Sequence, residues 1–206
     1  MALAVDTVHT GHDDHAEAPV WRAKANKLGL WMFIASETFL FAAFISSRYI
    51  LTGTGRPDDL NQALALFLTI VLLLSSISAY LGEQAIAHDD RRSMMWALSI
   101  TILLGLGFMV GVGFEWKEAL EFFPPSTTFG STFFMLVGLH AFHVVTGLIG
   151  LGFALNMGRK GRFNSKNFWF VEATVKYWHF VDLAWVVIYP TLYLVGTHAE
   201  FPIPGK

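Results

Sequence analysis

The stretch LNQALALFLTIVLLLSSISAYLGEQAI, residues 60–86, decides the fold, because its first charged residue is Glu83. As an α-helix, a segment of about 20 apolar residues crosses the hydrocarbon core of a bilayer. Four further stretches share this character, and the five predicted spans are about 28–50, 60–86, 93–115, 131–157 and 177–197. They are too long and too uniformly apolar for barrel strands, and lipid does not tolerate unpaired backbone groups. The sequence therefore predicts an all-α, polytopic transmembrane helix bundle with about five spans.

The composition excludes several classes of protein. Of the 206 residues, 54% are hydrophobic and 15% are charged, which is too apolar a balance for a soluble domain. The formal net charge of −2 argues against a nucleic-acid partner, since phosphate binding needs clustered cations. The chain has no cysteine, which excludes disulfides, iron–sulfur clusters, thioether-linked haem and thiolate copper centres.

Basic residues predict the orientation. With the N-terminus in the cytoplasm, ten of the 14 lysines and arginines lie on the cytoplasmic side, and four lie outside. Residues 1–27 are then a solvated cytoplasmic tail without a signal-peptide pattern, and residues 198–206 are an extracytoplasmic tail. A metal site at His9, His12 and His15 would need a helical tail, whereas Gly11 and its acidic neighbours favour disorder.

Ionisable side chains inside the spans are informative, because exposing one to lipid at mid-membrane costs about 3 kcal/mol or more. Glu37 fits a proton-handling or partner-contacting role, or a single interhelical hydrogen bond. His140 and His143 share one helix face, but a metal ion would need two further ligands, which favours a structural or lipid-contacting role. His179 and Asp182 also share a face, and can pair with each other or reach a neighbouring helix.

Three further predictions concern the outer half of the bundle. Glu115 and Glu118 flank Trp116 at the end of the third span, where anchoring at the membrane interface would explain them. Residues 118–126 include two consecutive prolines and are predicted to form a loop. Pro190 predicts a kink in the outer half of the fifth span.

Four motifs follow one another along the chain. They are GLWMFIASETFLF (residues 29–41), EWKEA (115–119), FGSTFF (129–134) leading into GLHAFHV (138–144), and YWHFVD (177–182) with Trp185 after it. In this order they resemble the third subunit of haem–copper respiratory oxidases, most closely the cytochrome c oxidase subunit III family. The resemblance covers nearly all of residues 28–197. Trp116 is a departure, since the family pattern has tyrosine there.

The resemblance implies a short, five-helix bacterial form of the family in the cell inner membrane. Such a subunit has no catalytic, cofactor-binding or metal-binding residues, and haem and copper lie on partner subunits. Its partners are catalytic subunit I, subunit II and structural phospholipids. The resemblance further implies support for enzyme stability and proton uptake during cytochrome c oxidation and reduction of oxygen to water. The candidate residues for lipid contact, subunit contact or proton-uptake support are Glu37, Glu115, Glu118, His140, His143, Trp178, His179 and Asp182.

Alternative functions stay open. The chain could be subunit III of a quinol oxidase, or a subunit III-like protein of nitric oxide reduction. From a different class, a small proton-coupled transporter could use Glu37, Asp182 and the histidines as a relay, although the sequence halves show no repeat of the kind transporters have. A membrane di-iron enzyme would need several histidine boxes in loops.

Overall fold

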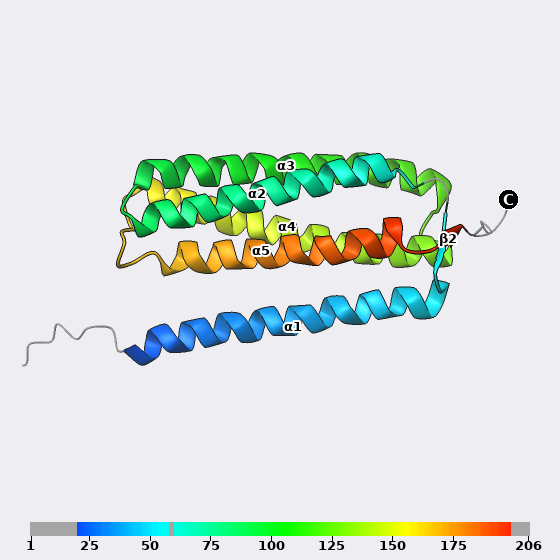
Figure 1. Cartoon of the computed structure of the whole chain (residues 1–206), viewed down its shortest axis with the longest axis horizontal. Coiled ribbons are helices and arrows are strands. Elements are labelled where there is room, and N and C mark those ends of the chain that lie inside the picture. The colour runs from blue at the N-terminus through cyan, green and yellow to red at the C-terminus, as the bar shows by residue number, and fades with distance from the viewer. Residues whose placement is uncertain (1–19, 58–59, 199–206) are drawn as a thin grey trace, which may run out of the picture.

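The structure is a computed structural model that describes residues 20–57 and 60–198. The described residues form five long helices, and Figure 1 shows that these alternate in direction. They are α1 (Val20–Thr52), α2 (Gln62–Ala87), α3 (Arg91–Phe122), α4 (Thr128–Arg159) and α5 (Trp169–Tyr189). A π-helix, Pro190–Leu194, continues α5, and the short strands β1 (Gly55–Arg56) and β2 (Thr197–His198) pair in parallel. The predicted all-α class is confirmed.

The helices form a four-helix bundle with one outer helix. Helices α2 and α4 each pack against both α3 and α5. Helix α1 lies outside this bundle and contacts α4 and α5 (Figure 1). Because α1 contacts only one side of the bundle, much of its surface stays exposed, including Trp31, Phe39 and Ile50.

Two tryptophans of α5 tie this helix to α2. The Nε1 of Trp178 donates to Ser75 Oγ and the Nε1 of Trp185 donates to Thr69 Oγ1, each at 3.0 Å. Both indole rings are fully buried, where an unpaired N–H would be costly. Glycines of the neighbouring helices leave room for Trp178, since a Cβ on Gly105 of α3 would lie 2.7 Å from its ring. The α2–α5 contact thus combines close packing with paired polar groups.

The turn between α2 and α3 is joined to the loop between α4 and α5. Asp89 adopts a left-handed φ of 60°, and its carboxylate accepts hydrogen bonds from the Ser165 amide at 2.6 Å and hydroxyl at 2.7 Å. These hydrogen bonds from Ser165 hold the pKa of the Asp89 carboxyl below its ordinary value. Arg91 donates to the carbonyl of Arg159 across the same gap. The contacts fix the four bundle helices to one another at this end.

The helices extend beyond the predicted spans. Helix α1 begins at Val20, within the predicted tail, because residues 21–27 contain no glycine or proline to stop it. Helix α3 continues to Phe122, so the loop prediction was wrong for residues 118–122, and the chain turns only at Pro124-Pro125. At Pro190 the helix changes to π-type hydrogen bonding, with the Val195 amide donating to the Pro190 carbonyl at 2.8 Å. The predictions for residues 1–19 and 199–206 lie outside the described residues.

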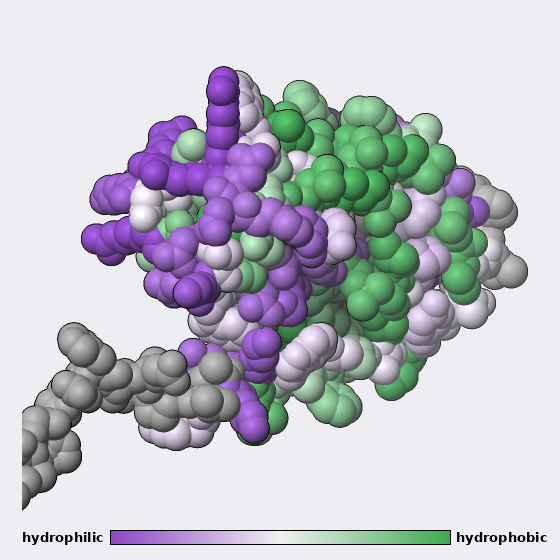
Figure 2. Space-filling view, turned by 60° about the vertical axis from the view of Figure 1, so that its left-hand side comes forward, coloured by the Kyte–Doolittle hydropathy of each residue, from purple (hydrophilic) through white to green (hydrophobic). Residues whose placement is uncertain are grey.

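Length and apolarity make the chain a membrane protein. Within the described residues, four helical segments are long and apolar enough to cross a bilayer: Lys24–Thr52, Gln62–Ala87, Arg91–Phe122 and Thr128–Arg159. Helix α5 carries Glu172, Lys176 and Asp182 in its 21 residues, which lowers its apolar character, but it packs between α2 and α4. Figure 2 shows polar residues gathered at the end that holds the α2–α3 turn, followed by a hydrophobic band.

Candidate functional site

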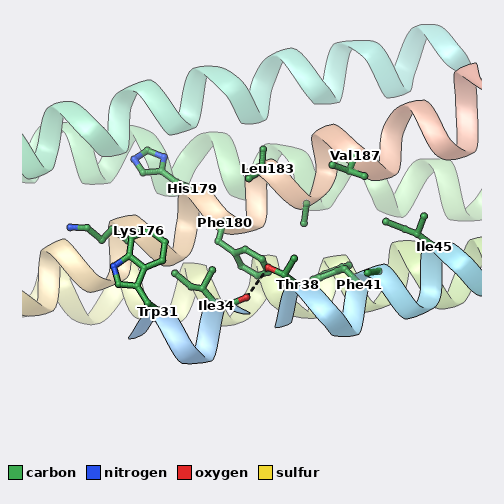
Figure 3. Close-up of a pocket in the computed structure, with 12 residues that line it drawn as sticks. Trp31, Ile34, Thr38, Phe41, Ile45, Lys176, His179, Phe180, Leu183 and Val187 are labelled. Atoms are coloured by element: carbon green, nitrogen blue, oxygen red, sulfur yellow. Dashed lines mark hydrogen bonds between the residues drawn. The ribbon is translucent and has the colours of Figure 1, made fainter. Parts of the chain in front are cut away.

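A long apolar groove lies between α1 and α5, with a volume of about 470 Å³. We call it the α1–α5 groove, and Figure 3 shows its lining side chains. They are Trp31, Ile34, Thr38, Phe41, Ala42, Ile45, Lys176, His179, Phe180, Leu183, Ala184 and Val187. The Thr38 hydroxyl already donates to the Ile34 carbonyl at 2.8 Å. The other two polar lining residues, Lys176 and His179, lie at one end of the groove.

Charges of both signs meet at this polar end. Lys176 Nζ lies 2.5 Å from Glu172 Oε1 and 3.5 Å from Glu83 Oε1. Lys27 of α1 lies 3.9 Å from the same Glu172 oxygen. The charges of two lysines and two glutamates from three helices therefore neutralise one another beside the groove.

His179 and Asp182 do not pair with each other. The Nδ1 of His179 bonds to Ser76 Oγ of α2 at 2.5 Å, so this histidine reaches a neighbouring helix, the second of the two predicted alternatives. Asp182 is only 3% exposed, and neither carboxylate oxygen has a hydrogen-bond partner among the described residues. Ser76 faces the carboxyl group but lacks hydrogen-bond geometry to it.

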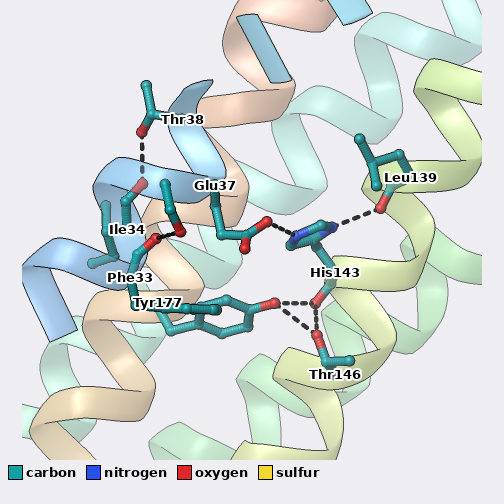
Figure 4. Close-up of polar contacts among 9 residues, drawn as sticks. Phe33, Ile34, Glu37, Thr38, Leu139, His143, Thr146 and Tyr177 are labelled. Atoms are coloured by element: carbon teal, nitrogen blue, oxygen red, sulfur yellow. Dashed lines mark hydrogen bonds and ion pairs between the residues drawn. The ribbon is translucent and has the colours of Figure 1, made fainter. Parts of the chain in front are cut away.

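Glu37 and His143 meet in a second, more open groove of about 550 Å³ between α1 and α4 (Figure 4). Their Oε2 and Nε2 atoms lie 3.0 Å apart, and His143 Nδ1 lies 2.8 Å from the Leu139 carbonyl oxygen. A carbonyl can only accept, so Nδ1 carries a proton. The Nε2–Oε2 contact then holds one further proton, on either atom. In both arrangements the pair has no net charge, which suits membrane depth.

Further hydroxyl groups line this α1–α4 groove beside the pair. Tyr177 of α5 hydrogen-bonds Thr146 of α4 at 2.7 Å, and Thr146 donates to the His143 carbonyl at 2.8 Å. Phe33, Leu40 and the remaining lining residues are apolar. The groove thus offers one polar patch on a hydrophobic wall.

His140 has different surroundings from His143. Its ring is fully buried, with centroids 4.9 Å from Trp185 and 5.6 Å from Phe108, and it lines neither groove. Neither ring nitrogen has a hydrogen-bond partner in the described part of the chain. Within residues 20–57 and 60–198, no three histidine, aspartate or glutamate side chains form a group that could hold a metal ion. His140 and His143 therefore do not act as one unit.

Glu115 and Glu118 also differ in their burial and in their hydrogen-bond partners. Glu115 is buried and accepts a hydrogen bond from the Tyr193 hydroxyl, so its place is inside the protein rather than at the interface. Arg56 and Gln62 donate to the carbonyl of Tyr193 and hold the end of the π-helix. Glu118 is exposed and contacts Asn61 at 3.4 Å. Interfacial anchoring fits Glu118 alone.

Sequence reasoning missed the role of Arg48. Its side chain is fully buried and donates to the carbonyls of Gly53 at 2.7 Å and Gly55 at 2.8 Å. Its guanidinium also lies 5.2 Å from the ring centroid of Phe129 on α4. The sequence did contain a signal for this role, because a glycine-rich turn follows Arg48 within seven residues. Carbonyl groups of such a turn need hydrogen-bond donors when they are buried.

Comparisons with known proteins agree with the resemblance seen in the sequence. The family model described as cytochrome c oxidase subunit III matches residues 5–197. Cytochrome c oxidase subunit 3 of Alkalihalophilus pseudofirmus is 35% identical over 208 residues, covering 95% of this chain and 98% of the relative. The proteins of that name from Pongo pygmaeus and Rattus norvegicus are 34% and 35% identical, covering 90% and 84% of this chain and 75% and 71% of the relatives. The chain therefore belongs to the cytochrome c oxidase subunit III family, whose members are parts of a membrane-bound oxidoreductase complex.

Proposed function

We propose that this chain is a non-catalytic subunit III of a proton-translocating haem–copper oxidase. It packs against catalytic subunit I in a complex that also contains subunit II, and holds structural phospholipid in the α1–α5 groove. In this role it supports enzyme stability and proton uptake while cytochrome c is oxidised and oxygen is reduced to water. The names of its relatives support the reaction, and the α1–α5 groove supports the lipid role.

The shape and polarity of the α1–α5 groove carry the lipid proposal. Its wall is apolar along most of its length, as an acyl chain requires. Lys176 lines its polar end, and the ion pairs of Lys176 with Glu83 and Glu172, and of Lys27 with Glu172, lie beside it. Such a mixture of charges complements both the phosphate and the ammonium of a zwitterionic head group.

We place the redox centres on partner subunits. The described histidines lie apart, since His140 is enclosed by aromatic rings, His143 pairs with Glu37 and His179 pairs with Ser76. This distribution supports a structural role for the chain. The Glu37–His143 pair, which holds one exchangeable proton and lines an open groove, is the candidate for support of proton uptake.

The proposed location is the bacterial inner membrane, with the N-terminus in the cytoplasm. The end of the bundle that holds the α2–α3 turn and the α4–α5 loop carries most of the basic residues, as the positive-inside rule requires of a cytoplasmic surface. Five antiparallel crossings would then place the C-terminus on the opposite side.

The phospholipid retained by the purified oxidase tests this function. Ala184→Phe should fill the α1–α5 groove without removing a charge, and Lys176→Met should weaken the head-group contact. We expect both variants to carry less phospholipid per haem than the wild type. The matched controls are Val186→Phe on α5 and Lys166→Met in the α4–α5 loop, neither of which lines this groove, and both should retain the wild-type amount. Equal lipid in Ala184→Phe and Val186→Phe would refute the assignment.

A further inference from the structure

We propose that Asp182 is a buried proton-exchange site that opens to the α1–α5 groove through Ser76 and His179. The ligand of this site is a proton. The proposal is independent of what occupies the groove and of any effect of the chain on proton uptake by the enzyme.

The surroundings of Asp182 require a proton on its carboxyl group. The side chain is 97% buried between α5 and α2, and neither oxygen has a hydrogen-bond partner among the described residues. An ionised carboxylate without a partner is far too costly in a low-dielectric interior. The neutral acid avoids this cost and leaves one O–H donor that can seek an acceptor.

Ser76 is the acceptor that the packing leaves available. The other two hydroxyls of α2 near this face, Ser75 and Thr69, already accept from the indoles of Trp178 and Trp185. Ser76 faces Asp182 on one side and bonds to His179 Nδ1 at 2.5 Å on the other. A serine hydroxyl both donates and accepts, so it can connect the two groups.

His179 completes the route to the membrane. It lies one turn before Asp182 on α5 and lines the α1–α5 groove, as Figure 3 shows. The charged group that acts on it is Lys176, which Glu172 and Glu83 hold at the polar end of the groove. Two titratable residues of α4 pack on this part of α5: His140 contacts the Trp185 ring, and the His143 ring lies 6.5 Å from the Tyr177 ring. A proton leaving Asp182 therefore has a polar path in one direction.

The exchange is a chain of proton transfers in which each atom that gives up a proton has a named acceptor. Asp182 transfers its carboxyl proton to Ser76 Oγ while the Ser76 hydroxyl gives its own proton to His179 Nδ1. His179 then releases the proton on Nε2 to a water molecule at the polar end of the groove, where Lys176 also lies. The reverse sequence takes up a proton and restores the neutral acid.

Infrared spectroscopy of the intact oxidase tests the proposal, because a protonated carboxyl group has its own C=O stretching band. We expect such a band in the wild type, shifted in D₂O and lost in Asp182→Asn. In Ser76→Ala and His179→Gln the band should remain but exchange with D₂O more slowly by about tenfold or more, since positioned side chains no longer transfer the proton. The matched control is Ser78→Ala on the same helix, whose hydroxyl bonds to the Ala97 carbonyl, and it should exchange at the wild-type rate.

If Asp182→Asn does not assemble, isotopic labelling of aspartate carboxyl groups identifies the band in the wild type. The exchange rates of Ser76→Ala and Ser78→Ala then still test the proposed route. Absence of an aspartic acid band would overturn the protonated state. Equal exchange rates in Ser76→Ala, His179→Gln and Ser78→Ala would overturn the route. Both outcomes are read from the infrared band and its exchange rate, and neither depends on the activity of the oxidase.

Discussion

Glu37 and His143 form the pair that links α1 to α4 within the membrane. Glu37→Ala removes the partner of His143 Nε2 and leaves a polar atom unsatisfied, which costs about 1–3 kcal/mol. We expect this variant to be released from the purified oxidase at a lower temperature than the wild type, with oxygen reduction retained. Glu37→Gln should be milder, because the amide can still donate to His143.

Ser36→Ala is the control for this comparison, since Ser36 precedes Glu37 and its hydroxyl donates to the Phe33 carbonyl of the same helix. Thermal release of the chain can be followed by native electrophoresis after heating. Identical release temperatures for Glu37→Ala and Ser36→Ala would show that the pair does not hold α1 in place.

At the scale of residues, the sequence identifies candidates but not their partners. Glu37, His143 and Asp182 could be selected because each is costly in lipid unless something compensates for it. Their surroundings could not be predicted, since Glu37 is 106 residues from His143 and Ser76 is 103 residues from His179. The separate surroundings of His140 and His143, two residues of one short motif, follow from packing alone.

The packing of α3 against α5 depends on a glycine. A methyl group on Gly105 would lie 2.7 Å from the Trp178 ring, so Gly105→Ala should destabilise the chain by about 1–3 kcal/mol through overpacking. Gly107→Ala on the same helix meets no atom within 4 Å and should be neutral or slightly stabilising. Thermal unfolding of the two variants in detergent measures the difference. Equal stability would mean that the Trp178 ring does not pack against Gly105 as described.

The link between Asp89 and Ser165 should depend on pH. Hydrogen bonds from Ser165 hold the pKa of Asp89 below its ordinary value of 3.8. A group whose pKa is lowered by folding stabilises the fold fully above its unfolded-state pKa. The contribution is lost as the pH falls through the lowered, folded-state pKa. At neutral pH, Asp89→Asn should therefore loosen the α4–α5 loop, while Asn still tolerates the left-handed backbone.

Hydrogen exchange of the peptide covering residues 160–168, corrected for intrinsic rates, measures this effect. Protection in the wild type should exceed that in Asp89→Asn at neutral pH, and the difference should vanish in acid. Asp90→Asn is the control, since the Asp90 carboxylate accepts from the Ser93 amide at the start of α3, whereas Asp89 accepts from Ser165 in the loop. Equal protection of the loop in Asp89→Asn and Asp90→Asn at neutral pH would rule out the link.

At the scale of elements, hydropathy predicts which segments are helices but not where they end. Proline gives the clearest signal, as at Pro124-Pro125, where the chain leaves α3. Helix α1 continues into polar sequence because nothing there breaks it. The caps at Asn61, Asp90 and Thr127 accept from backbone amides three residues on, but such residues are also common in loops.

At the scale of the whole molecule, α1 stands apart from a compact bundle and leaves a groove on either side. Hydropathy predicted the number of helices, because membrane thickness sets their length. It could not predict that α1 is the outer helix, since α1 is one of four described segments that are apolar enough to cross a bilayer. The large apolar surface of α1 is consistent with a place among lipids and other subunits.

Purification of the complex through an affinity tag on this chain tests the central claim most directly. Membranes of the native host are solubilised in mild detergent, and the eluate is assayed for haem absorbance and for oxygen reduction driven by reduced cytochrome c. We expect the chain to elute with a haem- and copper-containing catalytic subunit that reduces oxygen. Elution of the chain alone, with no haem and no oxidase activity, would contradict the account.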